Sequence, residues 1–287
     1  MANILGIGNA ALDIINIVDG YPAEDDEVRA INQRIVRGGN VANTLVVLSQ
    51  LGHNCTWGGV CKNDFFGQQI INDLNSYAIN TDNCKMELEG SVPTSYVTLN
   101  QRNGSRTIIH HRNLPEFSFT DFQTIELTNF DWIHFEGRNV IEIAKMFTKV
   151  KQVCPNIPIS LEVEKSRPYI EGLFAQVDFL LFSKTFAQYH INDAALFLQN
   201  IRKLSAANLV CAWGVDGGYA LDTTENLSYS SAYPPSQVVD TLGAGDTFNA
   251  GIIDSLCKQP KLATALTYAC KLAGKKCGQF GFKGLVD

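Results

Sequence analysis

The stretch Gly243-Ala244-Gly245-Asp246 places a carboxylate directly after three small residues. The β-branched pair Val238-Val239 precedes it, and apolar residues at helical spacing follow until Pro260, which we expect to end a helix. Small residues let the backbone N–H groups of Gly243, Ala244 and Gly245 approach a ligand closely, and a helix N-terminus adds partial positive charge. The segment therefore predicts an anion-binding turn with an acidic side chain beside it.

Asp246 is placed to act as a general base in the first turn of that helix. An ionised carboxylate there accepts the proton of a hydroxyl group as it attacks the γ-phosphoryl group of a nucleotide. The alternative role is a helix cap, which does not need Gly-Ala-Gly before it. The sequence has no Walker A pattern, and Gly6-Ile7-Gly8 continues to Ala11 where a dinucleotide-binding fingerprint needs glycine. Phosphoryl transfer is the chemistry that this segment favours.

Short polar side chains near the N-terminus are suited to binding a sugar, whose hydroxyl groups both donate and accept hydrogen bonds. Asn40 and Asn43 lie three residues apart at an expected helix start, and Gly39 permits close backbone contact. Asp13 follows the first expected strand, at the end where open α/β sheets bind ligands. Two alternatives stay open: the asparagines as helix caps or turn residues, and Asp13 as an ordinary loop carboxylate.

Alternating apolar runs and helical periodicity predict an α/β fold with a mostly parallel sheet covered on both faces. Strands are expected near residues 4–8, 56–60, 132–135, 157–163, 179–182 and 209–213, and helices near 39–52, 65–77, 140–153 and 193–204.

Two segments interrupt this alternation. Residues 13–37 are too long and polar for an ordinary loop, and residues 92–113 contain Asn103-Gly104, a strong hairpin signal. They predict a small β-rich lid inserted into one domain that spans residues 1–287.

Composition excludes several classes of protein. Of the 287 residues 45% are hydrophobic and 18% are charged, with a net charge of −6, so the basic surplus that nucleic-acid binding requires is missing. No apolar run approaches the roughly 20 residues that span a bilayer, and the start lacks a basic leader region. The eight cysteines form no CxxC pair and are expected to be buried, reduced thiols. A cytoplasmic protein without nucleic-acid or membrane partners is expected.

Two longer signatures support a resemblance to a known family. Residues 240–248, DTLGAGDTF, resemble the C-terminal signature of the ribokinase-like (PfkB) family of carbohydrate kinases, and Gly38-Gly39-Asn40-Val41-Ala42-Asn43 resembles its N-terminal one. The segments 21–25, 133–139, 162–165, 210–213 and 273–278 are similar to its ketohexokinase subfamily. The resemblance runs nearly end to end. It implies a three-layer α/β/α fold with a β-clasp lid, ATP and Mg²⁺ as reactants, and leaves a need for K⁺ open.

The resemblance also implies roles for individual residues. The catalytic group comprises Asp246 with Gly243, Ala244 and Gly245; sugar binding falls to Asp13, Asp25, Gly39, Asn40, Asn43 and Arg138; ATP binding falls to Arg106, Lys184, Gly214, Val215, Asp216, Gly217, Cys270 and the 243–245 turn. Asp25 would reach the sugar from a clasped partner subunit, although an acidic run such as 24–27 is usually only solvated. Residues 214–217 are also typical of a plain turn. The lone arginines are also typical of surface residues.

One departure concerns metal binding. Many relatives carry Asn-x-x-Glu after a late strand, where it organises Mg²⁺, and this chain has Ser183-Lys184-Thr185-Phe186 instead. Ketohexokinases depart similarly, with a lysine that corresponds to Lys184, which we expect to neutralise phosphate charge. The metal ligands stay unassigned. The implied reaction converts D-fructose to fructose 1-phosphate in a homodimer joined through the lid. The alternatives are a kinase for another sugar or a nucleoside and a silent sugar-binding regulator, while the missing fingerprint disfavours a reductase.

Overall fold

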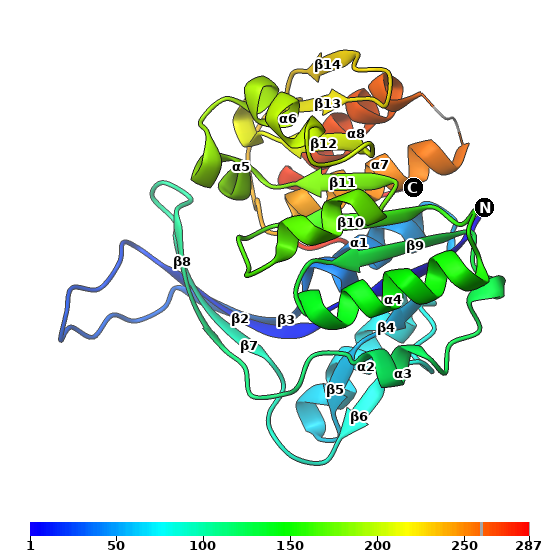
Figure 1. Ribbon diagram of the computed structural model, residues 1–287. Coiled ribbons are helices and arrows are strands. Elements are labelled where there is room, and N and C mark those ends of the chain that lie inside the picture. Colours follow the sequence, from blue (N-terminus) through cyan, green and yellow to red (C-terminus); the bar gives the residue numbers. More distant parts are fainter. Residues whose placement is uncertain (259–260, 287) are drawn as a thin grey trace.

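The computed structural model describes residues 1–258 and 261–286, and its centre is an eight-stranded sheet (Figure 1). The strand order is β14-β13-β12-β11-β10-β9-β1-β4, and all neighbours from β4 to β12 run parallel. Only the pairings of β13 with β12 and with β14 are antiparallel, so the predicted mostly parallel sheet is confirmed. The bounds are β1 Asn3–Ile7, β4 Asn54–Gly58, β9 Trp132–Glu136, β10 Ile159–Val163, β11 Phe179–Phe182, β12 Asn208–Ala212, β13 Gly218–Leu221 and β14 Leu227–Ser230.

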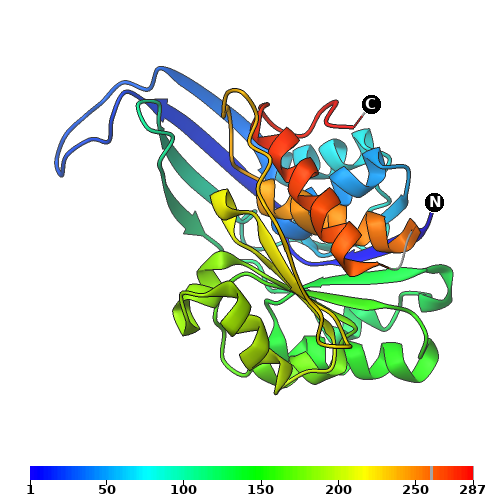
Figure 2. The same ribbon diagram turned by 90° about the horizontal axis from the view of Figure 1, so that it is seen from above.

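Helices cover both faces of this sheet and complete three layers (Figure 2). One face packs against α1 (Asn40–Gln50), α7 (Ala244–Lys258) and α8 (Leu262–Cys277), and the other against α4 (Val140–Val153), α5 (Lys184–His190) and α6 (Ala194–Arg202). Strand residues alternate between these layers: Leu180 and Phe182 join the α4 side, and Leu181 the α7 side. Both faces are therefore apolar, which explains the uninterrupted hydrophobic runs.

The remaining helices are short or lie at the edges. They are α2 (Phe65–Ser76), α3 (Phe119–Phe122) and the 3₁₀ helices η1 (Leu127–Asn129), η2 (Ile170–Gln176) and η3 (Gly214–Asp216). Among the described residues no helix is long and apolar enough to cross a membrane. Pro260, expected to end the helix that is α7, lies outside the described residues.

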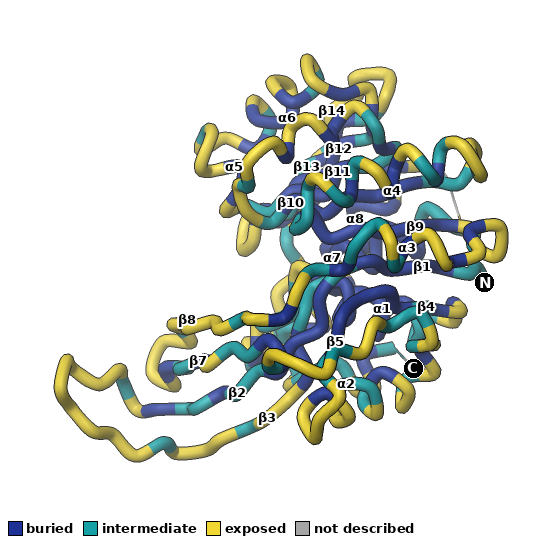
Figure 3. Tube along the Cα trace, turned by 60° about the horizontal axis from the view of Figure 1, so that its bottom comes forward, coloured by how far each residue is buried: buried dark blue, intermediate teal, exposed yellow. Residues whose placement is uncertain are grey.

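A second sheet projects from the body, and its exposed residues are concentrated on its two edge strands (Figures 1 and 3). Its order is β3 (Asn32–Gly38), β2 (Ala11–Val18), β7 (Thr94–Asn100) and β8 (Arg106–His111). The Asn103-Gly104 turn joins antiparallel β7 and β8, as predicted, and Gly104 adopts a φ of 68° there. A two-stranded parallel sheet, β5 (Val60–Lys62) with β6 (Lys85–Glu87), lies apart from both.

Asp13 lies inside β2 of the second sheet, because the chain resumes an extended course at Ala11 and pairs with β3 and β7. One local expectation was wrong. The strand expected over 56–60 is divided instead between β4 and β5, and the break falls at Gly59.

Candidate active site

A cavity of about 920 Å³ lies where the carboxyl ends of β1, β9, β10 and β11 meet the N-termini of α1 and α7. The second sheet forms another wall, to which Asp13, Ser95 and Arg106 contribute. This is the edge at which open α/β sheets bind ligands. The cavity therefore brings the two glycine-containing segments, 38–43 and 243–246, to one place.

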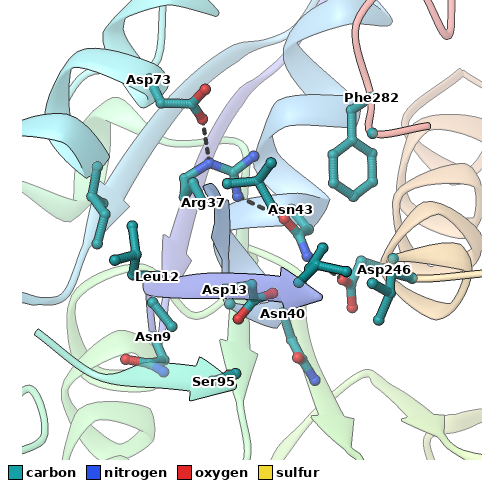
Figure 4. A pocket seen from close by; sticks show the side chains of 18 of the residues that line it. Asn9, Leu12, Asp13, Arg37, Asn40, Asn43, Asp73, Ser95, Asp246 and Phe282 are labelled. Atoms are coloured by element: carbon teal, nitrogen blue, oxygen red, sulfur yellow. Dashed lines mark hydrogen bonds and ion pairs between the residues drawn. The ribbon is translucent and has the colours of Figure 1, made fainter. Parts of the chain in front are cut away.

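Asp246 lies at the junction of α7 and α1 and is 8% exposed (Figure 4). Its Oδ2 accepts a hydrogen bond of 2.6 Å from the Asn43 side chain. Burial is the largest influence and, with the charges of Glu164 and Glu136, raises the pKa of Asp246 to about 8; the Asn43 bond and Arg37 partly oppose this. The arrangement makes Asp246 a stronger base than an exposed aspartate.

The turn before Asp246 has the backbone that its glycines predict. Gly243 has a φ of 77°, and a side chain there would clash with the ring of Phe282. Gly245 lines the cavity, and a Cβ on it would meet no atom within 4 Å. Ala244 is not among the cavity-lining residues, and its N–H donates to the carbonyl of Thr241 at 3.3 Å. Gly243 and Gly245 are thus the two residues whose backbone faces the space.

The start of α1 contributes the predicted amides. Gly39 is the N-cap with a φ of 101° and no side-chain capping bond, so neither asparagine caps the helix. A Cβ on Gly39 would clash with the Asn9 carbonyl. Asn40 donates to Glu162 and Glu164 at 3.2 and 3.3 Å. These bonds point the Asn40 side chain towards the ends of the central strands.

Arg37 fixes the orientation of Asn43 and was missed in the sequence. Its buried guanidinium donates to the Asn43 Oδ1 at 2.6 Å and to Asp73 at 2.6 Å (Figure 4). Because Arg37 engages the amide oxygen, the Asn43 nitrogen is the atom that faces Asp246. Arg37 immediately precedes the glycine pair, which is the one signal that sequence offers for its place.

Three glutamates that sequence reasoning left without a role surround Asp246. Glu136 ends β9, and Glu162 and Glu164 lie in and just after β10. The Glu162 Oε1 accepts from Asn40 and Asn249, while its Oε2 is buried without a partner in the described part of the chain. Burial and neighbouring carboxylates raise the pKa values of Glu136 and Glu162. Their position at the carboxyl ends of parallel strands is the signal that could have found them.

Asp13 faces the cavity beside Ser95, opposite the backbone of Gly38, where any side chain would collide with it (Figure 4). Burial raises its pKa, against a lowering effect of the Ser95 hydrogen bond and the Arg37 charge.

The two predicted arginines also line the cavity. Arg106 donates to the Thr241 hydroxyl at 2.8 Å and so links β8 to the anion turn. Arg138 is paired with Glu116 at 2.9 Å and with Glu136 at 3.4 Å.

The expected ATP residues on α5, on η3 and the glycine after it, and on α8 form a separate group. The Lys184 ammonium pairs with Asp216 at 3.2 Å, beside Gly214, and Val215 is exposed. Gly217 and Cys270 both approach the carbonyl of Ser230. None of these residues is among those that line the cavity, although Ser183 and Thr185, on either side of Lys184, do line it.

Asp25 lies far from this arrangement in the chain's own fold. It is exposed, with a φ of 64°, in the β2–β3 loop that projects from the molecule (Figure 1). Asp25 is the one predicted sugar-binding residue that does not line the cavity.

Comparisons with known proteins show which proteins the chain resembles. The model of the family described as pfkB family carbohydrate kinase matches residues 1–284. Ketohexokinase of Mus musculus is 41% identical over 293 residues, which cover 99% of this chain and 98% of the relative. Ribokinase of Bacillus subtilis is 26% identical over 290 residues, which cover 99% of this chain and 96% of the relative.

A solved structure shares the fold. The structure of Arabidopsis thaliana ribokinase complexed with ribose and ATP aligns with a TM-score of 0.79 at 21% identity, over 98% of this chain and 94% of its own.

Proposed function

The chain belongs to the pfkB family of carbohydrate kinases, and from that premise we propose that it transfers the γ-phosphoryl group of ATP to the 1-hydroxyl of D-fructose. The observation that carries the proposal is Asp246, which is buried with a raised pKa beside a helix N-terminus whose Gly245 faces open space. D-fructose follows from the 41% identity to mouse ketohexokinase.

Each side chain has a defined task in this reaction. Asp246 takes the proton of the attacking hydroxyl, whose oxygen forms the new bond to the γ-phosphorus, and the bond to ADP breaks. The N–H groups of Gly243 and Gly245 stabilise the charge of the transferred group. Asn40, Asn43 and Asp13 bind sugar hydroxyls, and Arg106 neutralises phosphate charge. Lys184 and residues 214–217 hold the rest of the nucleotide.

Mg²⁺ would be bound together with ATP, as a complex with its phosphates. Among the described residues no group of three or more acidic, histidine or cysteine side chains is arranged to hold a metal. This fits an ion whose ligands are mostly phosphate oxygens and water, with one or two carboxylates such as Glu164. Bound Mg²⁺ offsets the charge of the phosphates. Whether K⁺ is required can be measured by replacing KCl with choline chloride in an ADP-release assay.

We place the enzyme in the cytoplasm as a homodimer joined through the second sheet. Ile35, Tyr96 and Ile109 occupy one cross-strand row and are 51%, 48% and 69% exposed. Exposed apolar rows on an open sheet need covering. In that dimer Asp25 of the partner subunit reaches the sugar. Light scattering should give a dimer, and Ile109→Asp should give a monomer. A monomeric wild type would refute this assembly.

A panel of sugars and nucleosides with ATP·Mg²⁺, followed by ADP release, tests the function. D-fructose should turn over fastest, and phosphorus NMR should place the phosphate on O1. Asp246→Asn should lower kcat by about 10²- to 10⁴-fold while sugar affinity in calorimetry is retained. Faster turnover of ribose or a nucleoside would show that D-fructose is not the preferred substrate. Sugar binding without ADP release would favour a silent regulator. Near-normal activity of Asp246→Asn would show that Asp246 is not the general base.

A further inference from the structure

Lys276 on α8 is a completely buried lysine behind the anion turn. Its side chain is 0% exposed, and lysine is almost never fully buried without a partner. The ammonium donates to the carbonyls of Asp240 and Gln279 at 3.1 and 3.4 Å and lies 3.5 Å from the Asp240 carboxylate. The ring of Phe282 faces it at 5.6 Å. Oxygen atoms of two chain segments and an aromatic face thus surround one positive charge.

The residues around this charge determine the course of the anion turn. The Asp240 Oδ1 accepts from the N–H of Leu242 at 2.9 Å, which folds the chain just before Gly243. The N–H groups of Val239 and Asp240 donate to the Cys277 carbonyl. Gly243, at its positive φ, rests against the same Phe282 ring. The Lys276 ammonium therefore connects Asp240, which precedes the anion turn, with the C-terminal end of α8.

Stability alone does not account for a charge in this place. Burial lowers the pKa of Lys276, and the Asp240 charge, the Cys277 thiol and the Asp240 hydrogen bond oppose this lowering only in part. An apolar side chain of similar volume is often equally stabilising at a buried ionic site. What an apolar side chain lacks is the ability to hold two carbonyl oxygens and a carboxylate at fixed positions.

We propose that Lys276 is a positioning residue for phosphoryl transfer, a built-in cation that holds residues 240–243 so that the N–H groups of Gly243 and Gly245 face the transferred phosphate. The inference rests on the proposed kinase function and adds to it a residue that touches neither sugar nor nucleotide. Because the turn acts on the transition state, its displacement lowers kcat rather than sugar affinity.

Lys276→Met should lower kcat by about 10- to 100-fold, the scale of a small misplacement of catalytic groups, with the sugar KM within about twofold of wild type. Lys271→Met makes the same change at an exposed site on the same helix and should leave both constants unchanged. Should Lys276→Met not fold, Lys276→Met with Asp240→Asn removes both charges and should show the same loss of kcat.

Chemical rescue separates charge from volume. In Lys276→Ala, n-propylammonium restores the missing ammonium, and n-propanol supplies a neutral molecule of similar size. Rescue of kcat by the amine alone is expected. Equal rescue by the alcohol, or a folded Lys276→Met with kcat near wild type, would overturn the assignment. Wild type without kinase activity would instead refute the proposed function itself.

Discussion

Replacing Gly245 by alanine should make the protein more stable and nearly inactive. Gly245 lies in the first turn of α7, and an added methyl group would meet no atom within 4 Å. Alanine in a helix is favoured over glycine by roughly 0.5–1 kcal/mol. For a chain of this size 1 kcal/mol shifts Tm by roughly 2–4 °C, so Tm should rise by about 1–4 °C.

The same methyl group would stand where the γ-phosphate must approach the backbone. Loss of one such donor costs about 10²- to 10³-fold in kcat. Gly243→Ala is the matched comparison, since its φ of 77° and the Phe282 ring oppose a side chain. The backbone strain alone is roughly 1–2 kcal/mol, so its Tm should fall while its kcat also falls.

Differential scanning calorimetry and the coupled ADP assay test both variants. Tm should rise for Gly245→Ala and fall for Gly243→Ala, while kcat should fall for both. Gly245→Ala with raised Tm and wild-type kcat would show that no phosphate contacts this backbone. Gly245→Ala with lowered Tm would show that the space beside it is already filled in solution.

Three further expectations concern the groups around Asp246. The kcat/KM should fall as pH drops through the raised pKa of Asp246, and Glu164→Gln, which removes a neighbouring negative charge, should move that fall to lower pH. A buried acid with a raised pKa destabilises the fold as pH rises from about 4 to about 8, because its charged form is disfavoured in the folded state. Asp246→Asn should therefore raise Tm more at pH 8 than at pH 5, as measured by calorimetry at the two pH values. Arg37→Met should raise the sugar KM and lower kcat, because Asn43 loses its fixed orientation; unchanged steady-state constants would contradict this.

The central layers were predictable because their signals are local. The strand at 179–182 and the helix near 193–204 appear as β11 and α6 because each buries a continuous apolar pattern within a few residues. The 243–246 turn was predictable for the same reason, since its glycines and its carboxylate are consecutive. Roles assigned there on chemistry stay predictions until they are measured.

What sequence did not reveal depends on long-range pairing. Asp13 is in a strand because β2 pairs with β7, some eighty residues later, and no local pattern records that partner. Lys184 meets Asp216 across 32 positions. Arg37 and Glu162 look like ordinary polar residues until β3 and β10 bring them close to Asp246. The charged groups that shift the pKa of Asp246 come from several segments, so the shift arises only in the assembled fold.

The distribution of charge around Asp246 gives the cavity two different sides. Glu136, Glu162 and Glu164 gather at the ends of β9 and β10, while the backbone of Gly243 and Gly245 lines the cavity at the start of α7. A neutral sugar can accept hydrogen bonds from Asn40 and donate to carboxylates on the acidic side without electrostatic penalty. Phosphate is repelled there and is favoured on the other side, where the turn and Arg106 lie. In the proposed reaction, the carboxylates that raise the pKa of Asp246 therefore also direct the nucleotide away from the sugar, so base strength and substrate orientation would be two effects of the same cluster.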